Sequence, residues 1–311
     1  MYTSLDPRMD DAGELDPSIF PTAIAALALA DVNGAEDITH RALDHLAREM
    51  EPNGLWRHWP AGHPSRDDLP PDLDDTALAS AALEGAGRVL PDNRAVILAN
   101  RDRRGRFYTW ITPRLRRTPP SQRPIVRAQL ARPARTLLFF NQTSAAVNDV
   151  DAVVNANVVH YLGPVEGTEG AVAYLCDVLR SGTEASCDKW YPNPFMAWYA
   201  FARALAGVDR VACFLIERQL AAATPRTVLD VALGASALVA SGRVPDDDAV
   251  DALLREQRTD GSWRRVSLYF GGRVRLRDGT FATPHPDTPH WGSEELTTAL
   301  CLEALCGWRA G

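Results

Sequence analysis

The chain has 311 residues, 46% of them hydrophobic, and a formal net charge of −7 at pH 7. That length and apolar content can fill one large folded core, and the acidic balance argues against nucleic-acid partners, which require a basic face. The longest apolar stretch, residues 18–30, contains Pro21 and is shorter than the roughly 20 residues of a membrane span. We therefore expect neither a transmembrane segment nor a signal peptide.

The cysteine and basic residues add two expectations. The five cysteines are odd in number and none forms a C-x-x-C pair, which favours reduced thiols and a cytoplasmic location. Lys189 is the only lysine beside 32 arginines, a bias typical of a GC-rich bacterial genome. Arginines cluster over residues 101–117, either as a solvated surface or as a contact for an anionic ligand.

In chain order, six apolar stretches alternate with more charged ones. Because the apolar stretches are hydrophobic on nearly every face, each predicts a helix that is buried on nearly every side. The charged stretches are amphipathic and predict helices with one exposed face. The apolar stretches cover residues 18–30, 72–86, 149–162, 193–205, 227–241 and 293–305, and the clearest amphipathic ones cover residues 36–50, 170–179, 208–221 and 246–257.

This alternation predicts the fold. A buried helix followed by a half-exposed one, repeated about six times, is typical of a double ring of helices. We therefore predict an all-α (α/α)6 toroid that occupies residues 1–311 as a single domain. Two segments, residues 96–110 and 262–279, alternate polar with aromatic or aliphatic residues and predict short β-hairpins on one rim. Gly271 and Gly272 mark the turn of the second hairpin.

The sequence DLDDTA, residues 72–77, crowds three carboxylates into the start of one inner helix. Asp72 suits the N-cap, and Asp74 and Asp75 fall in the first turn, where each carboxylate gains roughly 0.3–1 kcal/mol from the helix dipole. A third carboxylate beside two others adds repulsion, which favours keeping one of them protonated. A carboxyl group that stays neutral at pH 7 can act as a general acid.

This motif resembles the D-x-D-D-T-A sequence of squalene-hopene cyclases and other class II terpene cyclases. Residues 257–263 (QRTDGSW) and residues 50–56 (MEPNGLW, with Met in place of Gln) resemble the Q-x-x-x-G-x-W repeat of the same superfamily. The resemblance implies a protonation-initiated terpenoid cyclase that acts on an isoprenoid. It also implies that Asp74 protonates a double bond or an epoxide, and that Asp72 and Asp75 tune its acidity.

Such a reaction needs a dry cavity lined by aromatic and apolar groups, because carbocations form in it. Polar residues at other inner-helix starts either line the same cavity, hold helices together or compensate a helix dipole. These polar candidates are Asp149, Asp151, Asn155, Asn157 and Glu294. The aromatic candidates are Trp56, Trp59, Phe107, Trp110, Trp190, Tyr191, Phe195, Trp198, Tyr199, Tyr269 and Trp291.

Chain length limits the substrate. Hopene-forming cyclases resemble two fused toroids of about twice this length, whereas this chain has room for one. The resemblance therefore implies an isoprenoid smaller than squalene, or a site that a homodimer or a second chain completes. No cofactor is required unless the substrate is a diphosphate, which Lys189, Arg57 or Arg273 could hold with Mg²⁺. Peripheral contact with a membrane is compatible with such a substrate.

Three alternatives stay open. Protein prenyltransferases resemble this toroid and bind zinc, and Cys187, Asp188 and His290 are the corresponding candidates, although the first two are adjacent instead of spaced D-x-C. A carbohydrate-active (α/α)6 enzyme would pair Asp74 with another inner-helix carboxylate such as Asp149. A non-catalytic toroid would capture an isoprenoid or a partner helix.

Overall fold

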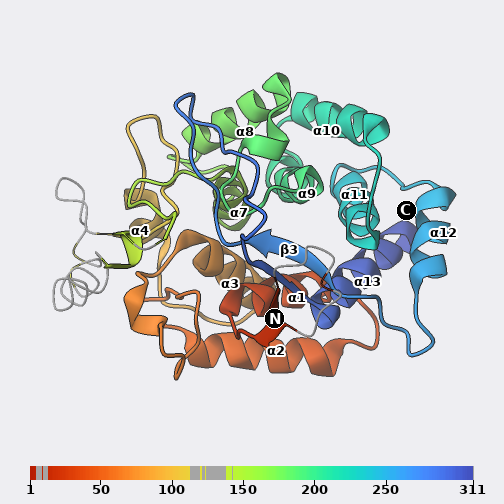
Figure 1. Ribbon diagram of the computed structural model, residues 1–311, viewed down its shortest axis with the longest axis horizontal. Coiled ribbons are helices and arrows are strands. Elements are labelled where there is room, and N and C mark those ends of the chain that lie inside the picture. The colour runs from red at the N-terminus through yellow and green to blue at the C-terminus, as the bar shows by residue number, and fades with distance from the viewer. Residues whose placement is uncertain are drawn as a thin grey trace.

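The computed structural model describes residues 1–4, 9, 13–112, 120, 123, 138–141 and 143–310, except the side chain of residue 310. Within these residues six helices form a closed inner ring, in which each helix packs on the next and the last packs on the first (Figure 1). The inner helices are α1 (Ile19–Ala28), α3 (Leu73–Gly85), α7 (Ala152–Leu162), α9 (Pro194–Leu205), α11 (Val228–Ala240) and α13 (Glu294–Ala310).

An outer layer of helices surrounds this ring. In the described part of the chain it comprises α2 (Glu36–Glu49), α4 (Arg94–Ala99), α8 (Glu169–Ser181), α10 (Arg210–Ala222) and α12 (Asp247–Glu256). Helix α2 packs against α1 and α3, α8 against α7, α10 against α9, and α12 against α11 and α13. The predicted helical toroid is therefore confirmed. The described residues include no helix whose length and apolarity would let it cross a membrane.

The inner helices form because their sequences are apolar all round and begin at capping residues. In α7 every residue except His160 is buried. At the start of α3, Asp72 accepts a hydrogen bond from the backbone amide of Asp75, and at the start of α9, Asn193 accepts one from the amide of Phe195. Each cap satisfies an amide that the helix itself leaves without a partner. The caps therefore determine where the inner helices begin.

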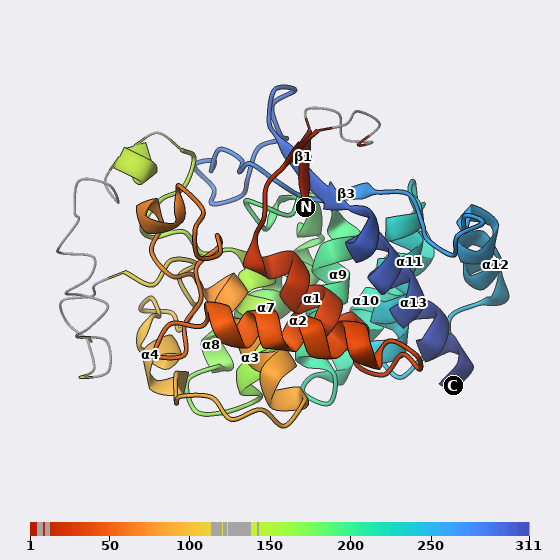
Figure 2. The same ribbon diagram turned by 90° about the horizontal axis from the view of Figure 1, so that it is seen from below.

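A four-stranded antiparallel sheet lies at the rim where α1 and α13 begin (Figure 2). Its strands are β1 (Tyr2–Ser4), β2 (Glu14–Leu15), β3 (Val266–Phe270) and β4 (His290–Ser293), in the order β2-β1-β4-β3. Strand β4 continues directly into α13, so the sheet is fixed to the ring. The sheet joins the N-terminal segment to the loops on this rim.

The rim strands are as short as predicted, but the pairing of β3 differs. β3 ends just before Gly271 and pairs with β4, instead of with the residues that follow the glycines. The backbone of Gly292 in β4 lies so close to Val266 of β3 that a side chain would not fit there. Gly292 thus permits the pairing of β3 with β4, which the glycines at positions 271 and 272 do not indicate.

Of residues 96–110, only 100–108 fold back in antiparallel pairing as the predicted hairpin does. Val96 and Ile97 are buried within one turn of α4, so the apolar residues there belong to a helix. Beyond α4 a single bridge between Arg101 and Phe107 closes a short turn. The prediction was wrong for residues 96–99, because a short apolar run fits a helix as well as a strand.

The two G-x-W segments adopt the same local structure at two places in the ring. Trp56 Nε1 donates to the carbonyl of Leu46 in α2, and Trp263 Nε1 donates to the carbonyl of Leu253 in α12, each at 2.8 Å. Both indoles are fully buried. The backbone amide of each tryptophan donates to a threonine hydroxyl of the following inner helix. Each tryptophan therefore ties the end of an outer helix to the inner ring.

This tie can be tested with Trp263→Phe. The substitution removes the indole N–H and leaves the buried carbonyl of Leu253 without its donor, which should lower the free energy of unfolding by about 1–3 kcal/mol. Urea unfolding followed by circular dichroism measures the change. Leu254→Ala, on the exposed side of the same helix, should stay within about 0.5 kcal/mol of wild type. Equal stability of the two variants would contradict the role given to Trp263.

Candidate active site

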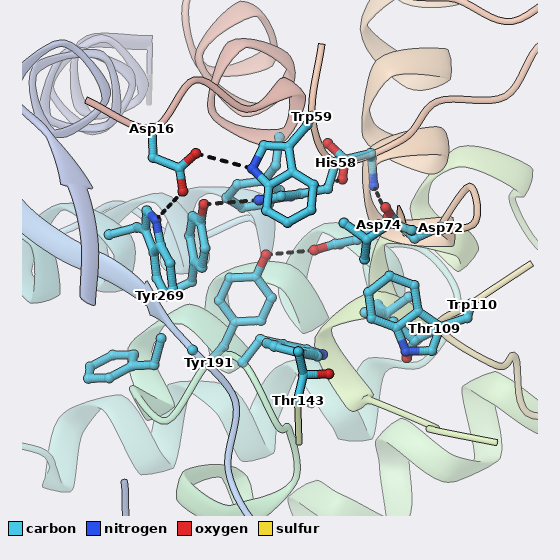
Figure 3. Close-up of a pocket in the computed structure, with 18 of the residues that line it drawn as sticks. Asp16, His58, Trp59, Asp72, Asp74, Thr109, Trp110, Thr143, Tyr191 and Tyr269 are labelled. Atoms are coloured by element: carbon cyan, nitrogen blue, oxygen red, sulfur yellow. Dashed lines mark hydrogen bonds and ion pairs between the residues drawn. The ribbon is translucent and has the colours of Figure 1, made fainter. Parts of the chain in front are cut away.

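A cavity of about 190 Å³ lies at the rim where the inner helices begin (Figure 3). On the inner helices it touches only residues near the start, namely Phe20 of α1, Asp74 and Asp75 of α3, and Val154 of α7. Deeper in the ring, side chains such as Leu78 are fully buried. The cavity is therefore shallow. Its described lining comprises Asp16, Phe20, His58, Trp59, Leu69, Asp72, Asp74, Asp75, Thr109, Trp110, Phe139, Thr143, Val154, Trp190, Tyr191, Tyr269, Phe270, Gly271 and Trp291.

Asp74 presents its carboxyl group to this cavity. The hydroxyl of Tyr191 donates to Oδ2 at 2.6 Å, and the side-chain amide of Asn157 donates to Oδ1 at 2.7 Å. Burial raises the pKa of Asp74 from 3.8 to about 7; the two hydrogen bonds oppose this rise, and the charge of Asp72 adds to it. Asp74 therefore keeps its proton to near-neutral pH and can still release it.

Asp72 and Asp75 are buried beside Asp74. Asp72 Oδ1 accepts the amide of Asp75 at 2.9 Å, whereas Asp72 Oδ2 and Asp75 Oδ1 have no hydrogen-bond partner among the described residues. Burial raises the pKa of Asp72 well above its usual range, and the charge of Asp75 raises it further. Burial likewise raises the pKa of Asp75 to about 7. The three carboxyl groups are thus held together with less than their full negative charge.

His58 connects this group to the aromatic wall. Its Nδ1 lies 3.5 Å from Asp75 Oδ2, and its Nε2 lies 3.4 Å from the hydroxyl of Tyr269. Burial lowers the pKa of His58 below 6.5, so the imidazole is neutral at pH 7. His58 therefore supplies a hydrogen-bonding group to the wall without adding positive charge.

Asp16 joins two sides of the cavity. Its Oδ1 accepts the indole N–H of Trp59 at 3.1 Å, and its Oδ2 accepts that of Trp291 at 2.9 Å (Figure 3). Tyr269 stacks on Trp291 with ring centroids 5.2 Å apart. Because the segment before α1 carries Asp16, the N-terminal part of the chain becomes one wall of the site.

The predicted aromatic residues divide between the cavity and the core. Those that line the cavity are Trp59, Trp110, Trp190, Tyr191, Tyr269 and Trp291. Those that pack into the core instead are Trp56, Phe107, Phe195, Trp198 and Tyr199. On α9, for example, Trp198 hydrogen-bonds to Gln219 of α10 and Tyr199 to Glu303 of α13, which directs their polar ends away from the rim.

Asp149, Asp151 and Asn155 support the wall from behind and are not among its lining residues. The hydroxyl of Thr109 donates a hydrogen bond to the carboxylate of Asp151, and the backbone amide of Thr109 donates one to the backbone carbonyl of Asp149. Asn155 bonds to both the amide and the carbonyl of Phe107. Burial and the neighbouring carboxylates raise the pKa of Asp151 to about 8. Together these side chains fix residues 107–109 against α7.

The three cations predicted to bind a substrate anion are engaged elsewhere, which corrects that prediction. Lys189 Nζ contacts both carboxylate oxygens of Asp149 at 2.6 Å in a buried ion pair. Arg57 pairs with Glu51 at 2.6 Å, and Arg273 donates to the backbone carbonyls of residues 185 and 188. None of the three lines the cavity. Lys189 and Arg273 are buried, and a buried cation needs internal partners such as these.

The arginine cluster of residues 101–117 is only partly described. Arg106 pairs with Asp102 at 2.7 Å, and Arg101 donates to the backbone carbonyl of Leu98. Neither arginine lines the cavity. Residues 113–117 lie outside the described part of the chain.

The other predicted ligands also lie away from the cavity. Glu294 forms a half-exposed ion pair with Arg258 at 2.6 Å. Cys187, Asp188 and His290 do not assemble a zinc site: the described residues contain no cluster of three or more His, Cys, Asp or Glu side chains placed to hold a metal ion. The carboxylate of Asp188 instead accepts three backbone amides.

Sequence reasoning missed several parts of the wall. Asp16 and His58 lie in loops and belong to no motif, so nothing in their neighbourhood along the chain marks them. Phe20 and Val154 appear in the sequence as ordinary apolar residues of inner helices. Asn157, behind the wall, was among the polar candidates, because an amide inside an apolar helix must find a polar partner. That partner is Asp74.

Comparisons with solved structures identify the architecture. A protein from Actinoplanes matches with a TM-score of 0.62 at 19% identity, over 98% of this chain and 96% of that one. A variant of the type II terpene cyclase MstE from Scytonema, in complex with the substrate geranylgeranyl dihydroxybenzoate, matches with a TM-score of 0.63 at 17% identity, over 97% of this chain and 90% of that one. This chain has a terpene-cyclase-like fold.

Other comparisons add little to this assignment. The apo structure of MstE matches equally well, with a TM-score of 0.61 at 18% identity, over 97% of this chain and 90% of that chain. No family model and no curated protein matches the sequence. The similarity therefore establishes the fold, and the chemistry must be argued from the site.

The raised pKa of Asp75 predicts how stability depends on pH. Its folded-state pKa is about 7, above the ordinary 3.8, so the folded protein binds this proton more tightly than the unfolded chain. The free energy of unfolding should therefore fall as the pH rises from about 4 to about 8. Asp75→Asn should flatten this fall. Urea unfolding at several pH values in that range measures how steeply the free energy of unfolding falls. Asp248→Asn, on the exposed face of α12, is the control and should keep the wild-type slope. Equal slopes for Asp75→Asn and wild type would refute the raised pKa of Asp75.

Proposed function

We propose that this protein is a class II terpenoid cyclase in which Asp74 starts the reaction by protonating an isoprenoid. The observation that carries the proposal is a half-buried carboxyl group, with a pKa of about 7, facing a cavity with a largely aromatic lining. Tyr191 and Asn157 donate hydrogen bonds to its oxygens, and Asp72 and Asp75 lie beside it. Protonation of an alkene requires such an acid in a water-poor site.

The proposed reaction begins with transfer of the Asp74 proton to one carbon of a double bond, or to the oxygen of an epoxide. In the alkene case the π electron pair forms the new C–H bond, and the adjacent carbon becomes a cation. The next double bond attacks this cation and closes a ring, and loss of a proton from the final cation ends the sequence. Asp74 is left as a carboxylate, which the donors Tyr191 and Asn157 stabilise until it takes up another proton.

The walls suit the cations that would follow. Indole and phenol rings offer electron-rich faces that attract positive charge without reacting as bases. Trp59, Trp110, Trp190, Tyr269 and Trp291 supply such rings around the cavity. Burial, the largest cause of the raised pKa, holds the proton on Asp74 until a substrate arrives, and the electrostatic effect of Asp72 adds to it.

We propose an isoprenoid substrate smaller than squalene, and no required cofactor. The cavity of about 190 Å³ is below the roughly 300–1,000 Å³ of typical ligand sites. MstE, a type II terpene cyclase, is covered over 90% of its length by this chain, so one toroid of this size is compatible with class II chemistry.

All five cysteines are free thiols, which supports the proposed cytoplasmic location.

The central test of this function uses Asp74→Asn, which keeps the shape of the side chain and removes the acid. Wild type and variant are incubated with prenyl alcohols, prenyl diphosphates, prenylated phenols and squalene, with and without Mg²⁺, and products are analysed by mass spectrometry. We expect a cyclised product from wild type and at least a hundredfold lower rate from the variant. An unchanged rate in the variant would refute the role of Asp74. No product from any substrate would favour the non-catalytic toroid.

The hydrogen bond from Tyr191 predicts a shifted pH profile. Because the reaction needs protonated Asp74, the rate should fall as the pH rises through about 7. The Tyr191 hydrogen bond lowers the pKa of Asp74, so Tyr191→Phe should move this fall to higher pH and reduce the rate on the acidic side, where a weaker acid donates more slowly. Tyr269→Phe removes a lining hydroxyl that does not contact Asp74 and should leave the midpoint in place. A common midpoint for all three proteins would contradict the proposed tuning.

A further inference from the structure

The cavity has a fourth carboxyl group, to which the proposed protonation step gives no task. Asp72, Asp74 and Asp75 come from the start of α3, whereas Asp16 comes from the segment between β2 and α1. Figure 3 shows Asp16 on one side of the cavity and Asp74 on the other. The side chain of Asp16 keeps 20% of its surface exposed, against 3% for Asp75. Asp16 is therefore a separate polar group of the wall.

Two indoles hold the carboxyl group of Asp16. Trp59 donates to Oδ1 at 3.1 Å, and Trp291 donates to Oδ2 at 2.9 Å. Both rings line the cavity and are only half-buried. Hydrogen-bond donors favour the ionised form of a carboxyl group, and a carboxylate in turn polarises the indole that donates to it. The faces of these two rings therefore attract positive charge more strongly than an indole without such a partner.

The positive groups near Asp16 in the described part of the chain offset its charge only in part. His63 Nε2 lies 3.5 Å from Asp16 Oδ1, and this contact is an ion pair only when the imidazole is protonated. The amino group of Met1 also interacts with Asp16, but burial lowers its pKa below the ordinary value, which reduces its charge at pH 7. The described cavity lining contains no lysine or arginine. This wall thus keeps a negative potential that a bound cation can use.

We propose that Asp16, Trp59 and Trp291 form a cation site for positive charge on an isoprenoid, in which Asp16 is a positioning residue that acts through the two indoles. The inference rests on the proposed function in that the cation is the carbocation created when Asp74 gives up its proton. Because this charge appears only after protonation, the wall stabilises the charged states of the reaction and contributes little to binding of the neutral substrate.

The first test replaces the carbocation by a stable ammonium ion. N,N-Dimethylgeranylamine, which is protonated at pH 7, is compared with the hydrocarbon that carries a CH group in place of the nitrogen. The two ligands share one shape and differ in charge. Both are titrated by quenching of tryptophan fluorescence in the Asp74→Asn background, where turnover does not interfere. We expect the amine to bind more tightly, and Asp16→Asn to weaken the amine at least about fivefold and the hydrocarbon less than about twofold.

Glu14→Gln is the matched control, because it removes one negative charge from the exposed strand β2, two positions before Asp16. It should leave both affinities within about twofold of the background, and circular dichroism establishes that each variant is folded. Equal weakening of both ligands by Asp16→Asn would show that Asp16 only holds the rings in place, and would overturn the proposal. Unchanged binding of the amine would overturn it as well.

Kinetics and product assays separate this inference from the proposed function. With a substrate that the wild type cyclises, Asp16→Asn should lower kcat at least about fivefold and change KM less than about twofold. Amine-selective binding that depends on Asp16, without any cyclised product, would leave the cation site standing and refute the cyclase assignment. Cyclised product together with amine binding that ignores Asp16→Asn would do the reverse.

Discussion

The site depends on keeping three carboxyl groups largely out of water at the start of α3. In solution such groups ionise near pH 4, and burying an ionised carboxylate without a cation is costly. Desolvation therefore raises the pKa of Asp72, Asp74 and Asp75 together. The described cavity lining holds no lysine or arginine that would offset the shift, and the one lysine of the chain is paired with Asp149. The outcome is an acid that retains its proton near neutral pH.

The fold makes this arrangement possible. Six apolar helices close a ring, and the cavity touches these helices only where they begin. There the N-caps, the small sheet and residues 107–110 surround a shallow cavity. Crowding three carboxyl groups at one helix start reduces stability, and a cost of this kind is typical of functional sites. The close packing of the ring, including the ties made by Trp56 and Trp263, compensates for it.

The ring and the acidic motif could be predicted because both depend on local patterns. The apolar stretch of residues 72–86 corresponds to α3 (Leu73–Gly85), and Asp72 caps it as expected. The partners of Asp74 could not be predicted, since Tyr191 and Asn157 lie 117 and 83 positions away along the chain. Lys189 was one of the cations expected to hold a substrate diphosphate, yet it contacts Asp149, 40 positions away along the chain. Contacts of this range leave no pattern in one sequence.

The same limit explains why the site had to be built from geometry. The sequence alone does not distinguish an aromatic residue that packs in the core, such as Tyr199, from one that lines the cavity, such as Tyr191.

The central claim is that burial keeps Asp74 protonated to near-neutral pH. Its most direct test is a pH titration of the ¹³C-labelled aspartate carboxyl groups by NMR, with Asp74→Asn to assign the resonance. A midpoint of about 7 would agree with the account, and a midpoint near 4 would contradict it.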